Sequence, residues 1–252
     1  MKLSVVIPAK DEEKSIEHTI GQLVGVLQEE QIDFEIIVVN DNSRDATARI
    51  VERMSAEDAR IVAVNRTPPA GFGRAVRDGL SNITGDAAAI FMADLSDSPK
   101  DLVQYYRKLQ EGYDCVFGSR FMRGSSVEGY PRLKLLVNRL GNLFIQVLFF
   151  TANNDITNAF KAYRKEVIEA VTPLTADYFN ITVELPLKAI TRGFSYTTVP
   201  ISWHGRKHGI SKHKMKELLK AYLFSVFRLF WERISMKNRS RKNPVSSEGT
   251  AL

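Results

Sequence analysis

Apolar residues in the first half of the chain come in short continuous runs, and amphipathic stretches separate these runs. LSVVIPA at 3–9 and FEIIVVNDNS at 34–43 are continuous runs, which are typical of strands buried on both faces. Between them, residues 12–31 carry apolar side chains at helical spacing. The alternation continues to residue 121 and predicts strands at 60–66, 87–94 and 113–121 and helices at 44–58, 71–83 and 99–112. This order predicts an α/β fold with a mostly parallel sheet flanked by helices.

The strand–helix alternation weakens after residue 121. Helices are predicted over 131–150, 181–194 and 214–234, a loop followed by a helix over 154–171, and a strand over 195–206. The final residues are polar and lack an apolar pattern, which is typical of a disordered segment. We therefore expect one large domain over 1–212, an amphipathic helix over 213–235 and a disordered polar tail over 236–252.

Composition and charge limit the cellular compartment and the class of binding partner that the protein can have. The 252 residues suffice for a sizeable core, and the single cysteine, Cys115, forms no internal disulfide, which fits a reducing compartment. The net charge of +6 is uneven, because the segment from His204 to Lys242 holds twelve Lys or Arg and two acids. Such a segment indicates an anionic partner. Its aromatic side chains are not interleaved with the basic ones as nucleic-acid stacking requires, so we expect no nucleic-acid partner.

Acidic side chains follow three of the predicted strands. Asp11 and Glu12 follow the first strand, Asp41 the second, and Asp94 and Asp97 the fourth. Because the carboxyl ends of parallel strands meet at one edge, these acids are expected to line a ligand site there. Carboxylates bind Mg²⁺ or Mn²⁺, which also bind phosphate oxygens, so Asp94 and Asp97 are the candidate metal ligands.

Three stretches also have structural interpretations. Asp97 could cap the helix predicted at 99–112 instead of binding metal. The turn GFGRAVRDG at 71–79 is either a plain helix start or an anion site in which Gly73 contacts the cofactor. The basic loop RKHGISKHK is either a solvated loop or a phosphate-binding loop that acts through Arg206, Ser211 and Lys212.

Seven motifs together resemble family 2 glycosyltransferases, and within them the dolichol-phosphate mannosyltransferases and related polyprenyl-phosphate sugar transferases. In chain order they are SVVIPAKDEE, VVNDNSRDAT, GFGRAVRDG, MADLSDSP, VFGSRF, DITNAFKAYRKEV and RKHGISK. The resemblance covers about residues 3 to 233. It implies an A-type glycosyltransferase fold, which is Rossmann-like and binds a nucleotide sugar, with the catalytic domain over 1–212.

The resemblance also implies a role for each matching residue. The base and ribose would be held by Pro8, Ala9, Glu12 and Asp41, and the metal and diphosphate by Asp94. Arg120 would lie near the sugar or the acceptor phosphate, and a closing phosphate-binding loop would contain Arg206, Ser211 and Lys212. Near the acceptor entrance and the donor sugar would lie Arg139, Asn142, Asn158 and Phe160.

The sequence departs from the family pattern at the metal motif. Met92 stands where the family usually has an Asp, and Ser96 stands where a Gln is frequent. Asp97 is the candidate replacement for the lost carboxylate. The stretch Lys10-Asp11 replaces a Tyr-Asn pair, and residues 157–161 match the family's Ser-Gly-Phe-Arg stretch loosely.

These observations predict an inverting transfer of a sugar from GDP-mannose or a UDP-hexose to a polyprenyl or dolichyl phosphate. Asp94 with its metal, Arg206 and Lys212 would stabilise the leaving diphosphate. A phosphate acceptor needs no general base because it is already ionised, and no base is evident in the sequence, although Asp155 is a candidate. Two alternatives stay open: transfer to a hydroxyl acceptor in polysaccharide or glycolipid synthesis, and a nucleotide-sugar-binding protein with impaired catalysis.

The predicted C-terminal helix fits a lipid acceptor. Its apolar side chains recur at helical spacing between Lys and Arg residues, with Trp231 near its end, as in helices that lie in a membrane interface. Its apolar stretch is too short to span a bilayer before Arg228 interrupts it. We expect a cytoplasmic protein peripheral at the cytoplasmic face of a membrane. The alternative is a helix packed on its own domain or on a second subunit in a homodimer.

Overall fold

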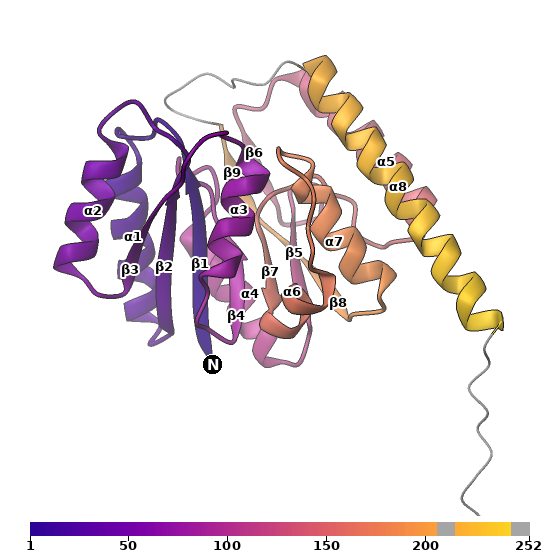
Figure 1. The fold of residues 1–252 in the computed structure, drawn as a ribbon, viewed down its shortest axis with the longest axis horizontal. Helices are drawn as coiled ribbons and strands as arrows, with labels where there is room; N and C mark the ends of the chain where they lie inside the picture. Colours follow the sequence, from indigo (N-terminus) through magenta and orange to yellow (C-terminus); the bar gives the residue numbers. More distant parts are fainter. Residues whose placement is uncertain (206–214, 243–252) are drawn as a thin grey trace, which may run out of the picture.

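A seven-stranded, mostly parallel sheet forms the centre of the protein (Figure 1). The computed structural model describes residues 1–205 and 215–242. The strand order is β3-β2-β1-β4-β7-β5-β8, and β7 runs antiparallel to both of its neighbours. The strands are β1 (Lys2–Ala9), β2 (Asp33–Asn40), β3 (Ile61–Asn65), β4 (Ala87–Ile90), β5 (Cys115–Ser119), β7 (Lys161–Arg164) and β8 (Tyr196–Pro200).

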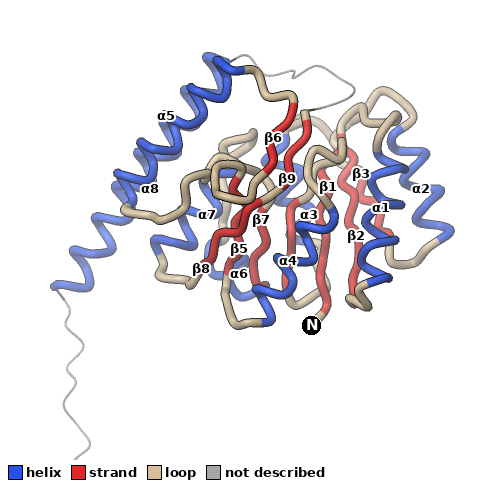
Figure 2. The backbone as a smooth tube through the Cα atoms, turned by 180° about the vertical axis from the view of Figure 1, so that it is seen from behind, coloured by secondary structure: helices blue, strands red, loops and turns tan. Residues whose placement is uncertain are grey.

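Helices cover both faces of this sheet (Figures 1 and 2). One face holds α1 (Ile16–Glu29), α2 (Thr47–Glu57) and α4 (Pro99–Gln110), and the other holds α3 (Phe72–Ser81), α6 (Lys165–Val171) and α7 (Ile181–Thr191). Along β1, Val5 and Ile7 pack with the first set and Val6 with the second, because successive strand side chains point to opposite faces. The predicted α/β fold, with its mostly parallel sheet flanked by helices, is confirmed.

Two long helices lie side by side at the β8 end of the sheet, as both views show (Figures 1 and 2). They are α5 (Arg132–Phe149) and α8 (Met215–Lys242). Apolar side chains of both helices share a core with α7. Polar contacts add to this attachment, because Asn180 Nδ2 donates to Ser225 Oγ at 2.9 Å and Arg228 Nη2 donates to Glu184 Oε1 at 2.6 Å. One side of α8 therefore packs on its own domain.

The strand β7 was missed by the sequence prediction, which placed a loop and a helix over 154–171. Residues 161–164 pair with β4 and β5 in the middle of the sheet, and α6 follows directly. Four residues are too few to show a periodic pattern, and the buried Lys161 at the start of β7 is unusual in a central strand. Pairing with two distant strands therefore decides this element.

Three other boundaries differ from the prediction. The fourth strand ends at Ile90 rather than 94, and the strand expected over 195–206 is divided into β8 and β9 (Ser202–His204). β9 leaves the main sheet to pair with β6 (Ser126–Glu128). The helix α8 continues to Lys242, past the expected end at 235, because its first strong helix breaker is Pro244. Among residues 1–205 and 215–242, none of the helices combines the length and apolar character needed to cross a bilayer.

Candidate active site

A cavity of about 970 Å³ opens at the carboxyl ends of β1, β2, β4 and β5. Its floor comes from the segments that follow these strands, and one wall comes from the facing sides of α5 and α8. Parallel strands place their carboxyl ends at a shared edge, and ligands of open α/β sheets bind at that edge. The cavity therefore lies at the edge of the sheet where the sequence predicts a ligand site.

The predicted base and ribose contacts come together on one side of the cavity. Pro8, Ala9, Glu12 and Asp41 all line it. The buried Asp41 carboxylate is held from two sides, because its Oδ1 accepts Arg66 Nη1 at 2.5 Å and its Oδ2 accepts the backbone N–H of Gly71 at 2.8 Å. The sequence analysis missed Arg66, although a cation at the end of a predicted strand was the signal. The pairing gives Asp41 a fixed orientation at the cavity wall.

The backbone amides of the glycine turn before α3 are engaged by acceptors within the protein. The backbone N–H of Gly73 donates to Asp177 O at 3.0 Å, and a Cβ at Gly73 would lie 2.3 Å from Ala176 O. The chain at 176–178 thus crosses the start of α3 and occupies the amides that a phosphate would need. Gly73 is buried by this packing and lies outside the cavity lining, and its predicted contact with the cofactor stays a prediction. The close approach of residues 176–178 explains why position 73 is a glycine.

The segment after β4 brings two carboxylates close together. Asp94 Oδ1 accepts the Ser96 N–H at 3.1 Å, while Asp97 lines the cavity and is 2% exposed. Among the described residues, neither Asp97 carboxylate oxygen has a hydrogen-bond partner. Burial and the nearby Asp94 raise the pKa of Asp97 to about 8, against the opposing charge of Arg120. An acid in this state is suited to binding a cation, which would supply the missing partner.

Met92 and Ser96 also line the cavity, beside these carboxylates. Within residues 1–205 and 215–242, no group of three or more His, Cys, Asp or Glu side chains is placed to hold one metal ion. Met92 is the residue at which the sequence resemblance places a carboxylate. The Asp97 carboxylate oxygens, which lack partners among the described residues, fit a divalent cation that Asp94 and the phosphate oxygens of a donor would also bind.

Arg120 follows β5 and is held by Asp155, which precedes β7. The Arg120 Nε and Nη2 atoms donate to the Asp155 carboxylate at 2.8 and 2.7 Å, and the Arg120 backbone N–H donates to it at 3.0 Å. Asp155 is fully buried and Arg120 is 8% exposed on the cavity wall. A carboxylate engaged in this way is not available as a general base, which removes the candidate base noted in the sequence.

Of the other residues predicted to lie near the substrates, some line the cavity and others are buried in the protein. Asn158 lines the cavity and donates to Gly118 O at 3.1 Å, whereas Phe160 is fully buried and stacks on Tyr105, so it belongs to the core. Asn142 is buried as well and fastens α5 to the loop before β7, donating to Thr157 Oγ1 at 2.9 Å. The predicted phosphate contacts Arg206, Ser211 and Lys212 lie outside the described residues.

The sequence analysis also missed a role for Lys161, which is 1% exposed. Its Nζ donates to Ile156 O at 2.9 Å, to Thr182 O at 3.3 Å and to Asn158 O. Burial lowers the pKa of this amine to about 7, although Asp155 acts to raise it. The ammonium group thereby clamps the loop that carries Asp155 and Asn158.

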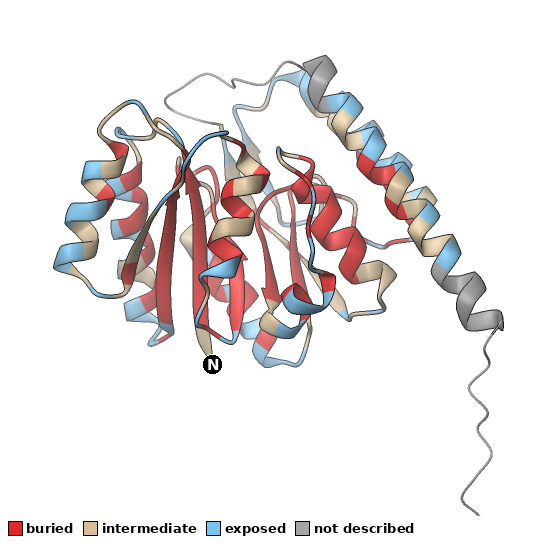
Figure 3. Cartoon of the chain, in the orientation of Figure 1, coloured by how far each residue is buried: buried red, intermediate tan, exposed pale blue. Residues whose placement is uncertain are grey.

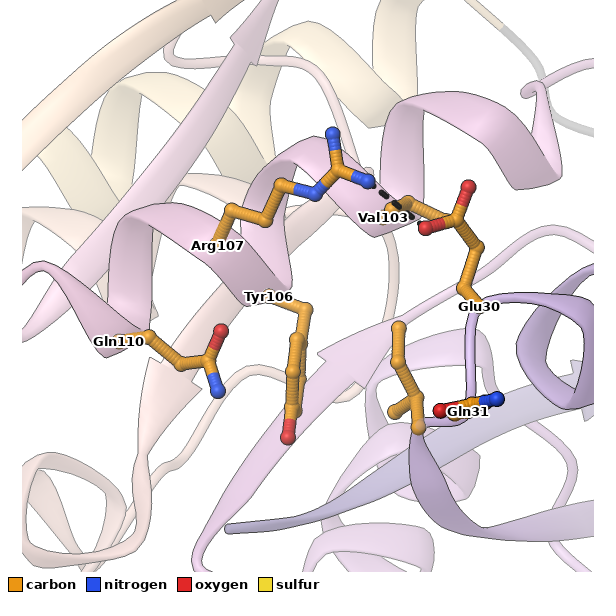
Figure 4. A pocket seen from close by; sticks show the side chains of 7 residues that line it. Glu30, Gln31, Val103, Tyr106, Arg107 and Gln110 are labelled. Carbon is orange, nitrogen blue, oxygen red and sulfur yellow. Dashed lines mark hydrogen bonds and ion pairs between the residues drawn. The ribbon is translucent and has the colours of Figure 1, made fainter.

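A second, smaller hollow of about 280 Å³ lies between the end of α1 and α4 (Figure 4). The figure shows Arg107 reaching across it to Glu30, with a separation of 2.7 Å between Arg107 Nη2 and Glu30 Oε2. Gln31 and Ile32 in its wall precede β2, so the hollow sits at the amino ends of the strands. Its surface ion pair needs no ligand, and we assign no chemistry to it.

Comparison with known proteins identifies the family. The sequence model of glycosyl transferase family 2 matches residues 4–172, and the chain therefore belongs to this family. The chain is 30% identical to a dolichol-phosphate mannosyltransferase of Pyrococcus furiosus over 236 residues, which cover 92% of the chain and 65% of that relative. It is 29% identical to a polyprenol monophosphomannose synthase of Mycolicibacterium smegmatis over 82% of the chain and 79% of that relative. The chain thus spans slightly less than two thirds of the Pyrococcus protein.

Solved structures give the same fold. The chain matches glucosyl-3-phosphoglycerate synthase from Mycobacterium tuberculosis in complex with Mn²⁺, UDP-glucose and phosphoglyceric acid with a TM-score of 0.68. The identity is 18%, and the match covers 91% of this chain and 79% of that chain. The same enzyme in complex with Mg²⁺ and UDP matches with a TM-score of 0.64. The predicted membership of the glycosyltransferase family and the predicted A-type fold are both confirmed.

The packing of the glycine turn yields a prediction about stability. Gly73→Ala should destabilise the fold by about 1–3 kcal/mol, because its methyl group would overlap the carbonyl of Ala176. Urea unfolding would measure the change. Gly21→Ala is the matched control, because Gly21 is an exposed helical glycine with open space where an added methyl group would lie, and it should be neutral or stabilising. Equal effects of the two substitutions would contradict the packing explanation.

Proposed function

We propose that the protein transfers a hexose from GDP-mannose or a UDP-hexose to a polyprenyl phosphate, with inversion at the anomeric carbon. The observation that carries the proposal is the cavity itself. It joins a polar end containing Asp41 and Asp97 to an apolar end lined by α5 and α8, including Phe144 and Leu223. A nucleotide sugar suits the first end and an isoprenoid chain the second. The names of the relatives from Pyrococcus and Mycolicibacterium support this assignment.

The proposed donor site uses the segments after β1 and β2. Pro8 and Ala9 would contact the base, while Glu12 and Asp41 would accept hydrogen bonds from the base or ribose hydroxyls. Asp41 is already oriented by Arg66, so it can accept these bonds without rearrangement. The proposed phosphate contacts Arg206, Ser211 and Lys212 complete the donor site outside the described residues.

Asp94 and Asp97 are the proposed ligands of Mg²⁺ or Mn²⁺. When bound, a divalent ion would supply Lewis-acid stabilisation of the charge on the leaving diphosphate. Both carboxylates lie in the segment after β4, and Asp97 lines the same cavity as Asp41, so the diphosphate of a donor bound at Asp41 would end near this segment. Binding would also satisfy the Asp97 oxygens, which lack partners among the described residues.

The acceptor phosphate is the proposed nucleophile. Its oxygen attacks the anomeric carbon, a new carbon–oxygen bond forms, and the bond to the diphosphate breaks, so that the nucleoside diphosphate leaves with the electron pair. No proton is removed from an ionised phosphate, which agrees with the engagement of Asp155 by Arg120. Arg120 on the cavity wall and Lys134, which lines the same cavity, are the proposed cations for this phosphate.

A membrane surface is the proposed location of the acceptor. The outward sides of α5 and α8 remain exposed, as the pale-blue segments of these helices show (Figure 3). We call this surface the apolar helical face, and its exposed side chains are Leu133, Leu136, Leu140, Leu143, Val147, Phe150, Phe224, Phe227 and Trp231. The sequence of α5 contains three cations and no acid. That charge favours an anionic lipid surface over a second copy of the same helix, so we propose a peripheral protein at the cytoplasmic face.

The function is tested by the release of nucleoside diphosphate. Purified protein is incubated with a panel of GDP- and UDP-sugars and polyprenyl phosphate, with Mn²⁺ or with EDTA. We expect metal-dependent turnover with one donor and negligible turnover without the lipid. Turnover with a hydroxyl acceptor instead would favour polysaccharide or glycolipid synthesis. Nucleotide-dependent thermal stabilisation without any turnover would favour a binding protein.

The metal site is tested by restoring a carboxylate. Met92→Asp should tighten Mn²⁺ binding in the presence of nucleotide by about tenfold or more, because it adds an oxygen ligand beside Asp94. Isothermal titration measures this without turnover. Met92→Leu, which keeps the apolar volume, should leave the affinity unchanged, and Asp94→Asn in the Met92→Asp background should abolish the gain. An unchanged affinity in Met92→Asp would mean that this position does not face the ion.

The membrane assignment is tested by sedimentation with vesicles of phosphatidylcholine and phosphatidylglycerol. The double substitution Leu136→Gln, Leu140→Gln should reduce the bound fraction several-fold, because both side chains belong to the apolar helical face. The matched control Gln22→Ala, Glu29→Ala changes exposed positions of α1 and should bind as the wild type does. A dimer without vesicle binding that the leucine substitutions dissociate would assign the face to a homodimer.

A further inference from the structure

Four charged side chains are buried where β4, β5 and β7 meet: Asp97, Arg120, Asp155 and Lys161. The proposed mechanism uses Asp97 and Arg120 directly, and Lys161 is accounted for by the carbonyl groups it binds. Asp155 is fully buried and is not itself part of the cavity lining. Its position therefore requires an explanation of its own.

The backbone of Asp155 is held by hydrogen bonds that do not involve Arg120. Its backbone N–H donates to Asn153 Oδ1 at 2.7 Å, and its carbonyl accepts the N–H of Asn158 at 3.1 Å. The neighbouring carbonyl of Ile156 accepts the buried Lys161 ammonium group at 2.9 Å. The carboxylate therefore stands on a loop whose backbone is itself held by hydrogen bonds, so it offers Arg120 a rigid partner.

The remaining sides of the Arg120 guanidinium group face aromatic rings. Its Cζ atom lies 5.4 Å from the ring centre of Phe121, 5.5 Å from that of Tyr130 and 6.0 Å from that of Trp203. Asp155 engages the Nε and Nη2 atoms, which leaves Nη1 as the nitrogen that the carboxylate does not use. The rings and the carboxylate together restrict the guanidinium plane to one orientation.

Burying the Asp155–Arg120 ion pair costs desolvation free energy, so a contribution to stability is not sufficient to explain why the pair is there. Two buried charges lose their hydration, and apolar side chains of similar volume are frequently at least as stable in such a position. A bidentate pair instead specifies geometry, because the planar guanidinium fork matches one carboxylate orientation. Lys134 Nζ lies 5.8 Å from the centre of the same Tyr130 ring, so a second cation stands beside the oriented one.

We propose that Asp155 is a positioning residue that fixes Arg120, so that the guanidinium edge that Asp155 does not engage, which lies beside Tyr130, meets the phosphate of the acceptor. The inference rests on the proposed function for the identity of that phosphate. Asp155 itself contacts neither substrate. It acts by keeping Arg120 in the productive orientation, and its loss should weaken acceptor binding and leave the donor site intact.

A double-mutant cycle tests this inference, with the variants Asp155→Asn, Arg120→Met and their combination. We expect Asp155→Asn to raise the KM for a short-chain polyprenyl phosphate about tenfold to a hundredfold and to leave the Kd of the nucleoside diphosphate unchanged. In the Arg120→Met background, Asp155→Asn should change the KM less than twofold. In the Arg120→Met background, Asp155→Asn should also raise the melting temperature, because the Asp155 carboxylate would be buried there without its cationic partner.

Glu35→Gln is the matched control for the loss of a buried carboxylate. Glu35 is 5% exposed and binds Ser4 and Thr84 at the opposite edge of the sheet. The Glu35→Gln substitution should lower the melting temperature and leave the KM for the acceptor unchanged. An equal effect of Asp155→Asn on the KM with and without Arg120 would overturn the proposal, as would a KM effect of Glu35→Gln of the same size.

Two further measurements keep the inference separate from folding and from the proposed function. Should Asp155→Asn fail to fold, Arg120→Lys keeps the charge and loses the fork, and it should raise the KM as Arg120→Met does; wild-type kinetics in Arg120→Lys would overturn the proposal. Should the wild type transfer no sugar, the proposed function fails, and calorimetry with farnesyl phosphate tests Asp155 alone. Asp155→Asn should then weaken binding only where Arg120 is present, and no binding by the wild type would overturn the inference.

Discussion

The reversed direction of β7 is the constraint on which the site depends. Lys161, the first residue of β7, pairs with Ile90 and Phe117 near the carboxyl ends of β4 and β5. Because β7 runs against its neighbours, the segment before it arrives at the same edge of the sheet as the segments after them. A parallel strand in this place would have sent that segment to the opposite edge. Asp155 and Arg120 meet only for this reason.

The buried charged groups at this edge of the sheet differ in whether they have a partner within the protein. Arg120 and Asp155 satisfy each other, and Lys161 is satisfied by backbone carbonyls. Asp97 is equally buried, yet its carboxylate has no hydrogen-bond partner among the described residues. Native proteins rarely leave a buried polar group in this state without a ligand or a role. The exception lines the cavity, at the position where a metal and a diphosphate are proposed.

The loop between α5 and β7 joins the polar site to the apolar helical face. Asn142 on α5 and Thr157 on the loop bond to each other twice, at 2.9 and 3.1 Å, close to Asp155. The helix that presents exposed leucines is therefore attached to the segment that orients Arg120. A lipid held along α5 would reach the cavity with its headgroup beside this arginine, which couples the proposed membrane surface to the proposed reaction.

The sequence by itself determined the alternating strands and helices, and with them the edge at which the cavity forms. Pro8, Glu12, Asp41 and Asp97 could be placed there because each lies at the end of a predicted strand or within three residues after it, and position along the chain is local information. Only the tertiary structure decided what depends on distant contacts. It reversed β7, covered Gly73 with the chain at 176–178, placed Phe160 in the core and paired Asp155 with Arg120. Periodicity and motif order describe neighbours along the chain, whereas the partner of a buried charge is chosen by packing across the sheet.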